Sequence, residues 1–212
     1  VYCDSLPDAD DNDPSIGPLV DNQYVIPVDN LIRTCVNIND SGTYYIYSDI
    51  DTNLSENDIC IAIYANDVIL LNREHSIDIG DNGVAISSVG NSGVVVDGVR
   101  IQNGDTGISF DSVEGGYLLN LKVENCDKGI DISQCPNIIV RDDSISSCSV
   151  GLRISISDSV QIGWSSIAAC DTGAVLSNVD YSTIRPLWIT SSTQMGLFID
   201  ANCNRNLFDH LW

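Results

Sequence analysis

The sequence predicts an all-β protein, a right-handed parallel β-helix whose coils of about 22 residues each contain three short strands. Glycines stand at positions 107, 129, 151, 173 and 196, so the first three intervals are equal and the fourth is only slightly longer. Beside each glycine, apolar and polar residues alternate with the period of a strand. Cys126, Cys148 and Cys170 repeat the same interval. Two independent rows with one period are difficult to obtain by chance, so the repeat predicts a solenoid.

Each predicted coil contributes apolar side chains to continuous inward rows. Equivalent residues of successive coils would stack about 4.8 Å apart, which is the spacing of paired strands. The rows that follow the glycines are Ile108, Phe110, Ile130, Ile132, Leu152, Ile154, Ala174, Leu176, Leu197 and Ile199. A second set is Ile138, Val140, Val160 and Ile162, and a third is Val123, Ile145, Ile167 and Ile189.

The elements before the repeat are less regular. Apolar alternation from residue 24 to residue 51, interrupted at Asp40-Ser-Gly42, predicts strands joined by a turn. Coil-forming strands follow at residues 59–63 and 67–72, and residues 83–107 form a coil with a longer turn. The chain is therefore expected to have about six or seven coils.

An aspartate stands two residues before most repeat glycines, at positions 81, 105, 127 and 171, with Ser149 as the exception. The favoured explanation is turn chemistry, in which Asp caps its own backbone and Gly takes a positive φ. A carboxylate ladder that collects calcium is the alternative.

Residues 1–22 are rich in aspartate and proline, and three of their side chains alternate as in a calcium-binding loop: Asp8, Asp10 and Asn12. The expected glycine and glutamate at the sixth and twelfth positions of such a loop are replaced by Asp13 and Leu19. We expect a solvated acidic arm, with calcium as the one cofactor to consider. The predicted division is an arm at residues 1–22, cap strands at 23–58 and a β-helix at 59–212.

Composition limits the classes of function. Nine basic residues against 30 acidic ones give a net charge of −21, which argues against nucleic-acid binding because affinity for phosphates needs basic residues. Mean hydropathy is near zero and no apolar run reaches the roughly 18 residues of a membrane helix. The chain opens without a methionine or a signal-peptide pattern, as expected of a mature or trimmed chain.

Eight cysteines and two histidines lack the spacing of a zinc site. The repeating row predicts inward, packed sulfurs for Cys126, Cys148 and Cys170, whereas the other five are the candidates for disulfides or exposed thiols: Cys3, Cys35, Cys60, Cys135 and Cys203. Asn39 and Asn53 begin glycosylation sequons. Together these features favour an extracellular or cell-surface location.

Four segments carry a family resemblance: Gly42-Thr-Tyr-Tyr-Ile, Cys60-Ile-Ala-Ile, Ala65-Asn-Asp-Val-Ile-Leu-Leu-Asn and His75-Ser-Ile-Asp-Ile-Gly80. In this order they resemble the first coils of pectin-lyase-like β-helix repeat proteins, including those on archaeal cell surfaces. With the later repeats, the resemblance covers roughly residues 35–211. It implies the fold and leaves the function open, because lyases, glycosidases, viral spikes, adhesins and envelope proteins share it.

One constellation suits carbohydrate chemistry: Lys122, Asp142, Asp143 and Arg185. A polysaccharide lyase needs a strong base beside carboxylates, and an inverting glycosidase needs two carboxylates about 6.5 to 9.5 Å apart. The Asn-Thr-Asp, Gly-His-Gly and Arg-Ile-Lys motifs of the similar polygalacturonases are missing, which favours a solvated turn pair at Asp142 and Asp143. Trp164 and Trp188, in successive coils, suggest either a carbohydrate platform or packing.

We therefore expect a non-enzymatic structural role, as an envelope, sheath or surface-layer subunit. Such a subunit would form a homo-oligomer or polymer through the ends and flanks of its β-helix, with Cys3 and Cys203 as candidates for disulfides between copies. A carbohydrate-active enzyme and a non-catalytic glycan-binding adhesin are the alternatives.

Overall fold

The computed structural model describes residues 30–72 and 74–211. The chain divides into two units, Val1–Leu31 and Ile32–Trp212, and the second, described here by itself, is the β-helix. The acidic arm, with Asp8, Asp10, Asn12 and Cys3, lies outside the described residues. The described strands form three sheets, and every pairing recorded among β2–β24 is parallel.

The first sheet has nine strands: β1 (Leu31–Ile32), β3 (Gly42–Ile46), β6 (Val68–Leu71), β9 (Val95–Asp97), β12 (Tyr117–Leu119), β15 (Ile139–Arg141), β18 (Gln161–Gly163), β21 (Thr183–Ile184) and β24 (Leu207–Phe208). The second sheet has seven: β4 (Ile50–Asp51), β7 (Ser76–Asp78), β10 (Arg100–Gln102), β13 (Lys122–Glu124), β16 (Ser144–Ser146), β19 (Ser165–Ala168) and β22 (Leu187–Thr190). The third sheet has eight: β2 (Val36–Ile38), β5 (Ile59–Ile63), β8 (Val84–Val89), β11 (Thr106–Asp111), β14 (Lys128–Ser133), β17 (Val150–Asp158), β20 (Thr172–Asp180) and β23 (Met195–Ile199).

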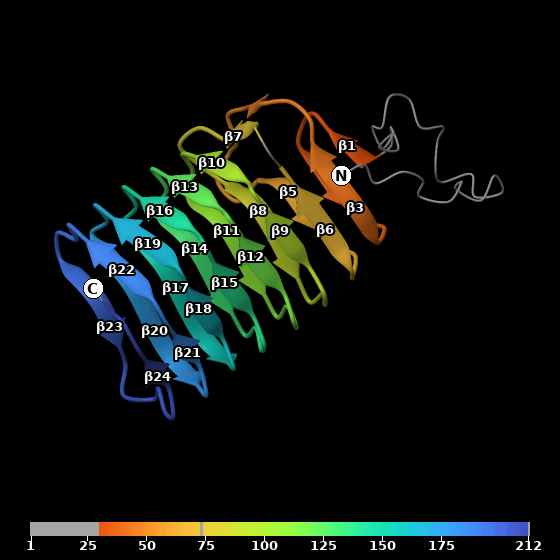
Figure 1. Cartoon of the computed structure of the whole chain (residues 1–212). Coiled ribbons are helices and arrows are strands. Elements are labelled where there is room, and N and C mark those ends of the chain that lie inside the picture. The colour runs from red at the N-terminus through yellow and green to blue at the C-terminus, as the bar shows by residue number, and fades with distance from the viewer. Residues whose placement is uncertain (1–29, 73, 212) are drawn as a thin grey trace, which may run out of the picture. The chain divides into compact units, whose positions relative to one another are not determined.

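Successive strands belong to different sheets, so the chain winds right-handedly around one axis (Figure 1). After β11, β12 and β13 have formed one coil, β14 returns to pair with β11. Ile108 then faces Ile130, the equivalent residue of the next repeat. The predicted parallel β-helix, with three short strands in each coil, is confirmed.

The structure has about eight coils, so the expected count of six or seven is too low. The additional coil comes from the predicted cap strands, because β2, β3 and β4 pair with β5, β6 and β7. Val36 pairs with Ile61, Gly42 with Val68, and Ile50 with Ile77. These partners lie farther apart in the sequence than the repeat glycines do, and by unequal amounts, which hides the coil from a search for that fixed period.

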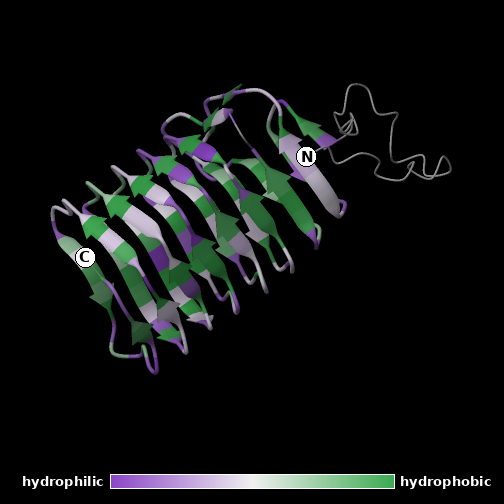
Figure 2. Cartoon of the chain, viewed as in Figure 1, coloured by the Kyte–Doolittle hydropathy of each residue, from purple (hydrophilic) through white to green (hydrophobic). Residues whose placement is uncertain are grey.

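The predicted inward rows form the core. Side chains at these positions are almost completely buried in the middle coils, and Figure 2 shows hydrophobic and hydrophilic residues alternating along the strands. The last coil differs: Ile199 is 39% exposed, whereas Leu176, its partner one coil earlier, is 1% exposed. Leu197 and Ile189 are also only partly buried.

The repeat glycines are required by close approach to the next coil. A Cβ on Gly129 would lie 2.5 Å from the Gly151 carbonyl oxygen and 2.5 Å from Ile145 Cγ2. Gly107, Gly129, Gly151 and Gly173 do not have a positive φ, so the predicted turn chemistry is wrong for them. The preceding aspartates also act between coils: Asp105 accepts from the Gly83 N–H, and Asp171 accepts from the Thr193 hydroxyl.

Residues at the corners of the coils, unlike these glycines, have the positive φ of the left-handed region. The corner between the first and second sheets has φ of 74° at Gly98, 52° at Asn120, 60° at Asp142 and 55° at Trp164. Gly, Asn and Asp adopt this region most readily, whereas bulky side chains seldom do. Trp164 is therefore an exception that folding alone does not favour.

Candidate functional site

The four residues of the predicted catalytic constellation lie along one edge of the β-helix, at the corner between the first and second sheets. Asp142 and Asp143 form the turn between β15 and β16, Lys122 begins β13 one coil earlier, and Arg185 follows β21 two coils later. The repeat thus brings them to one corner, as the period of the sequence predicts. Their side chains do not converge.

Asp143 points into the β-helix. Its side chain occupies the inward position that Leu121 holds one coil earlier and Ser165 one coil later, and the residue is only 2% exposed. Its Oδ1 accepts a hydrogen bond from the Leu121 N–H at 2.8 Å, while Oδ2 has no partner among the described residues. Burial, with a smaller contribution from the charge of Asp142, raises the pKa of Asp143 to about 8, so the carboxyl is protonated at neutral pH.

Asp142 and Lys122 lie on the surface, and each pairs with a neighbour on its own coil. Asp142 Oδ2 lies 3.0 Å from Arg141 Nε, and Lys122 Nζ lies 2.9 Å from Glu124 Oε2. Because Asp143 faces the core and Asp142 faces solvent, the two carboxyls cannot both reach one bound sugar. The constellation does not form the paired-carboxylate geometry of a glycosidase.

Two tryptophans stand on the same corner. Trp164 is 58% exposed, and its ring centroid lies 6.1 Å from that of Trp188 in the next coil, with the planes tilted by 50°. Beside them, Arg141, Gly163 and Arg185 occupy equivalent positions of three successive coils and so form one column along the axis of the β-helix. This column was missed in the sequence, although the two arginines are separated by twice the interval of the repeat glycines.

The cysteines divide differently from the prediction. Cys126, Cys148 and Cys170 are buried, which confirms the inward row. Cys35 and Cys60 form a disulfide between the first two coils, with their Cα atoms 4.3 Å apart. Cys135 was expected to be exposed or paired, and this is wrong: it is fully buried and unpaired, because the Val113 and Ser157 positions stack directly before and after it.

Cys203 is partly buried with a free thiol, and burial raises its pKa. Asn39 and Asn53, the predicted glycosylation positions, are exposed, and their modification stays a prediction.

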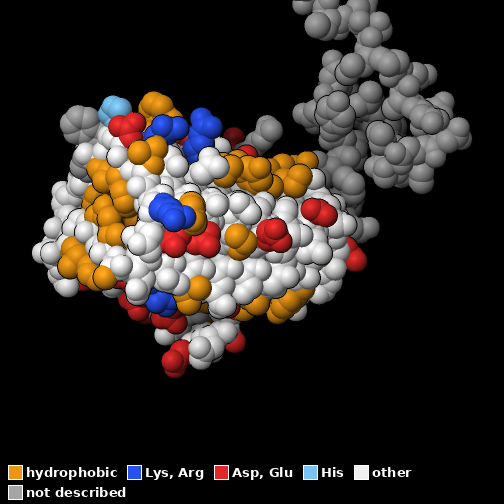
Figure 3. Space-filling model, turned by 90° about the horizontal axis from the view of Figure 1, so that it is seen from below, with side chains coloured by type: hydrophobic (Ala, Val, Ile, Leu, Met, Phe, Trp, Pro, Cys, Tyr) orange, Lys and Arg blue, Asp and Glu red, His pale blue; other side chains and the backbone are white. Residues whose placement is uncertain are grey.

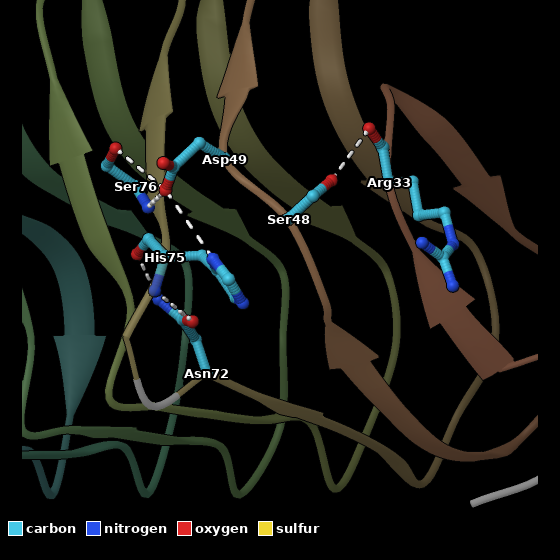
Figure 4. A network of polar contacts seen from close by, with 6 residues as sticks. All are labelled: Arg33, Ser48, Asp49, Asn72, His75 and Ser76. Carbon is cyan, nitrogen blue, oxygen red and sulfur yellow. Dashed lines mark hydrogen bonds and ion pairs between the residues drawn. The ribbon is translucent and has the colours of Figure 1, made fainter.

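Figure 4 shows a polar network at the first coils, in which the side chains of Ser48, Asp49 and Asn72 form hydrogen bonds with backbone groups. Asp49 Oδ1 accepts from the Ser76 N–H at 2.8 Å and lies 3.6 Å from His75 Nδ1. The Ser76 N–H bond is the main cause that lowers the pKa of Asp49. Asn72 closes the turn by bonding both the N–H and the carbonyl of His75. The network therefore serves the turn between β6 and β7.

The family model of the periplasmic copper-binding protein (NosD) matches residues 59–210. The chain belongs to the NosD family. The family description and the disulfide both indicate a location outside the cytoplasm, in the periplasm or beyond it. Among the described residues there is no helix of the length and apolarity that a membrane crossing requires.

The described residues of this NosD-family chain do not fit a copper site. No three His, Cys, Asp or Glu side chains among them converge to hold a metal. Contact with the Cys126 thiol, together with burial, raises the pKa of Cys148 to about 11, so this soft donor keeps its proton at neutral pH. Each metal-binding thiol must lose its proton.

The solved structures similar to this NosD-family chain include β-helix proteins that act on carbohydrates. Tailspike protein 2 from Escherichia coli O157:H7 bacteriophage CAB120 is 13% identical with a TM-score of 0.51, and the alignment covers 76% of this chain and 28% of the tailspike. The alginate lyase from Paenibacillus sp. str. FPU-7 is 10% identical with a TM-score of 0.38, and the alignment covers 80% and 98% of the two chains. No curated protein matches the sequence. The tailspike likeness supports the fold, and the archaeal resemblance stays a prediction.

Proposed function

We propose that this chain is an extracytoplasmic structural protein, a subunit of the cell envelope of the sheath or surface-layer type. Copies associate through the flanks and ends of the β-helix. The chain contributes a stiff rod with adhesive surfaces and carries out no chemistry of its own.

One observation carries this proposal: large apolar side chains stand on the flanks where the backbone disfavours them. Ile156, Trp164 and Tyr181 are 55–58% exposed and have φ between 50° and 55°. A left-handed conformation costs about 1–2 kcal/mol for such residues. Exposed apolar groups at strained positions contribute little to folding, whereas buried Trp and Tyr dominate protein interfaces.

The packing between coils supports a mechanical role. The carboxylate of Asp131 receives two hydrogen bonds from Arg153 in the next coil, at 2.8 and 2.6 Å, on the outer face of the third sheet. The Cys35–Cys60 disulfide joins the first two coils covalently. Of the described cysteines, Cys203 is the one that is not buried and not paired, so it is the candidate for a disulfide between copies.

The test is electron microscopy and sedimentation of the purified chain across a range of concentrations, with and without a thiol reductant. Ordered filaments, tubes or sheets support the proposal, and loosening upon reduction places cysteines at the contacts. Dispersed monomers under every condition overturn it.

The pair of exposed Trp164 and partly buried Trp188 favours a second candidate, a glycan-binding adhesin or a carbohydrate-active enzyme. Exposed aromatic rings offer apolar faces on which sugar rings can stack. Binding of polysaccharides that is lost in Trp164→Ala, without turnover, would support the adhesin. Release of new reducing ends or unsaturated sugars would support the enzyme.

A further inference from the structure

We propose that copies of this chain pack side by side through two surfaces in matching register, a ridge of arginines and tryptophans on one copy and a row of aspartates on the next. The Arg–Trp ridge consists of Arg141, Trp164, Arg185 and Trp188. The Asp row consists of Asp127, Ser149 and Asp171. This inference rests on the proposed self-assembly and names the lateral contact.

The Arg–Trp ridge is unusual on so acidic a chain. The protein has nine Lys and Arg residues against a net charge of −21, yet two arginines share one exposed column. Gly163 lies between Arg141 and Arg185 and adds no side chain to the column. Figure 3 shows basic, histidine and hydrophobic side chains, with some acidic ones among them, along the upper left edge of that view.

Both arginines can bind an additional carboxylate. Arg185 makes no ion pair with a described residue, and Arg141 uses its Nε toward Asp142 at 3.0 Å. A guanidinium has five N–H donors in a fork that matches a carboxylate, so donors remain on each side chain. The column of Arg141 and Arg185 would therefore attract an acidic surface on a partner.

The Asp row supplies such a surface on the opposite edge of the second sheet. Asp127 and Asp171 are exposed, and each precedes a strand of the third sheet. Lys128, Val150 and Thr172 pair in register, so the residues before them stack in one column. Ser149 occupies the middle, one coil from each aspartate.

The two columns have the same axial pattern. Arg141, Gly163 and Arg185 follow one another at the interval of one coil, and Asp127, Ser149 and Asp171 do the same. Arg141 and Arg185, and likewise Asp127 and Asp171, are separated by two coils, about 9.6 Å at the spacing of paired strands, with a neutral residue between them; Asp105 stacks one coil before Asp127 and extends the acidic column. Copies with parallel axes can therefore form both Arg–Asp pairs at once.

The tryptophans explain why such a contact would persist in water. Exposed ion pairs alone are weak because solvent screens them. Trp164 and Trp188 lie beside the arginine column, and burying aromatic rings between copies adds the apolar area that interfaces need. Because the ridge of one copy meets a different surface of the next, the contact is heterologous and extends into an open array.

Charge reversal tests the pairing. Arg141→Glu with Arg185→Glu, and separately Asp127→Lys with Asp171→Lys, each leave every copy without one of the two complementary surfaces. In sedimentation experiments each double variant should associate about a hundredfold more weakly than the wild type, because like charges then face each other. An equimolar mixture of the two double variants should recover association, since each supplies the surface that the other lacks.

The matched control is Arg33→Glu, compared with the single variant Arg141→Glu, because it makes the same change in net charge at an exposed position in the first coil, away from the ridge. It should associate as the wild type does. Thermal melting of every variant confirms that it is folded. Reversal variants that associate like the wild type, or a mixture that stays monomeric, would overturn the interface.

A cross-linking experiment separates this interface from self-assembly in general. Arg141→Lys with Arg185→Lys introduces amines, and a zero-length carbodiimide then joins them to contacting carboxylates. Mixed isotope-labelled and unlabelled chains should give intermolecular cross-links to Asp127 and Asp171. Assembly of this Lys variant without these cross-links contradicts the interface alone, whereas monomers of the wild type at every concentration contradict the proposed function.

Discussion

Asp143 should make the stability of this β-helix fall as the pH rises. Its carboxyl group is buried at an inward corner position, and burial raises its pKa from 3.8 to about 8. Below pH 3.8 the group is protonated in both the folded and the unfolded chain. Between pH 3.8 and 8 the folded chain retains the proton that the unfolded chain has lost, so raising the pH favours unfolding.

The magnitude follows from the size of the pKa shift. One pKa unit corresponds to about 1.4 kcal/mol, so this single group should lower the free energy of unfolding by roughly 4 kcal/mol between pH 4 and pH 7. Above pH 8 the carboxyl is ionised in both states and the loss levels off. An asparagine has no such proton to lose, and its side-chain oxygen can still accept the hydrogen bond from the Leu121 N–H.

Asp143→Asn should therefore match the wild type near pH 4 and exceed it by roughly 4 kcal/mol at pH 7. The assay is urea denaturation of both proteins at intervals from pH 4 to pH 9, with slopes compared to confirm that the transitions are equivalent. Asp142→Asn is the control, because this neighbouring carboxylate is exposed beside Arg141 and its charge contributes less than burial to the pKa of Asp143, so the variant should retain most of the pH dependence. A difference between wild type and Asp143→Asn that does not change with pH would refute the reasoning.

Three further predictions concern packing between coils. Gly129→Ala should lower the free energy of unfolding by about 1–3 kcal/mol in thermal or urea denaturation, because its Cβ meets fixed backbone, whereas Gly90→Asn, with open space and a φ of 69°, should be nearly neutral. Cys60→Ala should lower the free energy of unfolding by roughly 3 kcal/mol because it removes the disulfide. With a thiol reductant present, the wild type and the variant should then have equal stability. Arg153→Met should lower the free energy of unfolding by about 2–3 kcal/mol, because the largely buried Asp131 carboxylate loses the two hydrogen bonds from Arg153. Adding Asp131→Asn should recover part of this loss. If the effects of the two substitutions simply add in a double-mutant cycle, the pair is not coupled and the prediction is wrong.

The sequence by itself determined the repeating part of the fold. A strand has a side-chain period of two and a β-helix repeats by translation, so a constant interval identifies both the inward rows and the stacked row at Cys126, Cys148 and Cys170. The first coil was not recognised as one because its partners, such as Val36 with Ile61 and Ile50 with Ile77, lie farther apart than that interval. The position of Cys135 was misjudged for a similar reason, since its stacked equivalents are Val113 and Ser157 and no row of cysteines marks it.

Only the tertiary structure decided what the corners do. Asp142 takes a φ of 60°, and Asp143 faces the core in the same stacked position as Leu121 one coil earlier, where it has no partner for its Oδ2 among the described residues. The pairing of Cys35 with Cys60 likewise depends on which strands lie in register. Residue spacing determines which side chains stack along the axis of a β-helix, but the backbone conformation at each corner determines which of them point inward and which reach a partner.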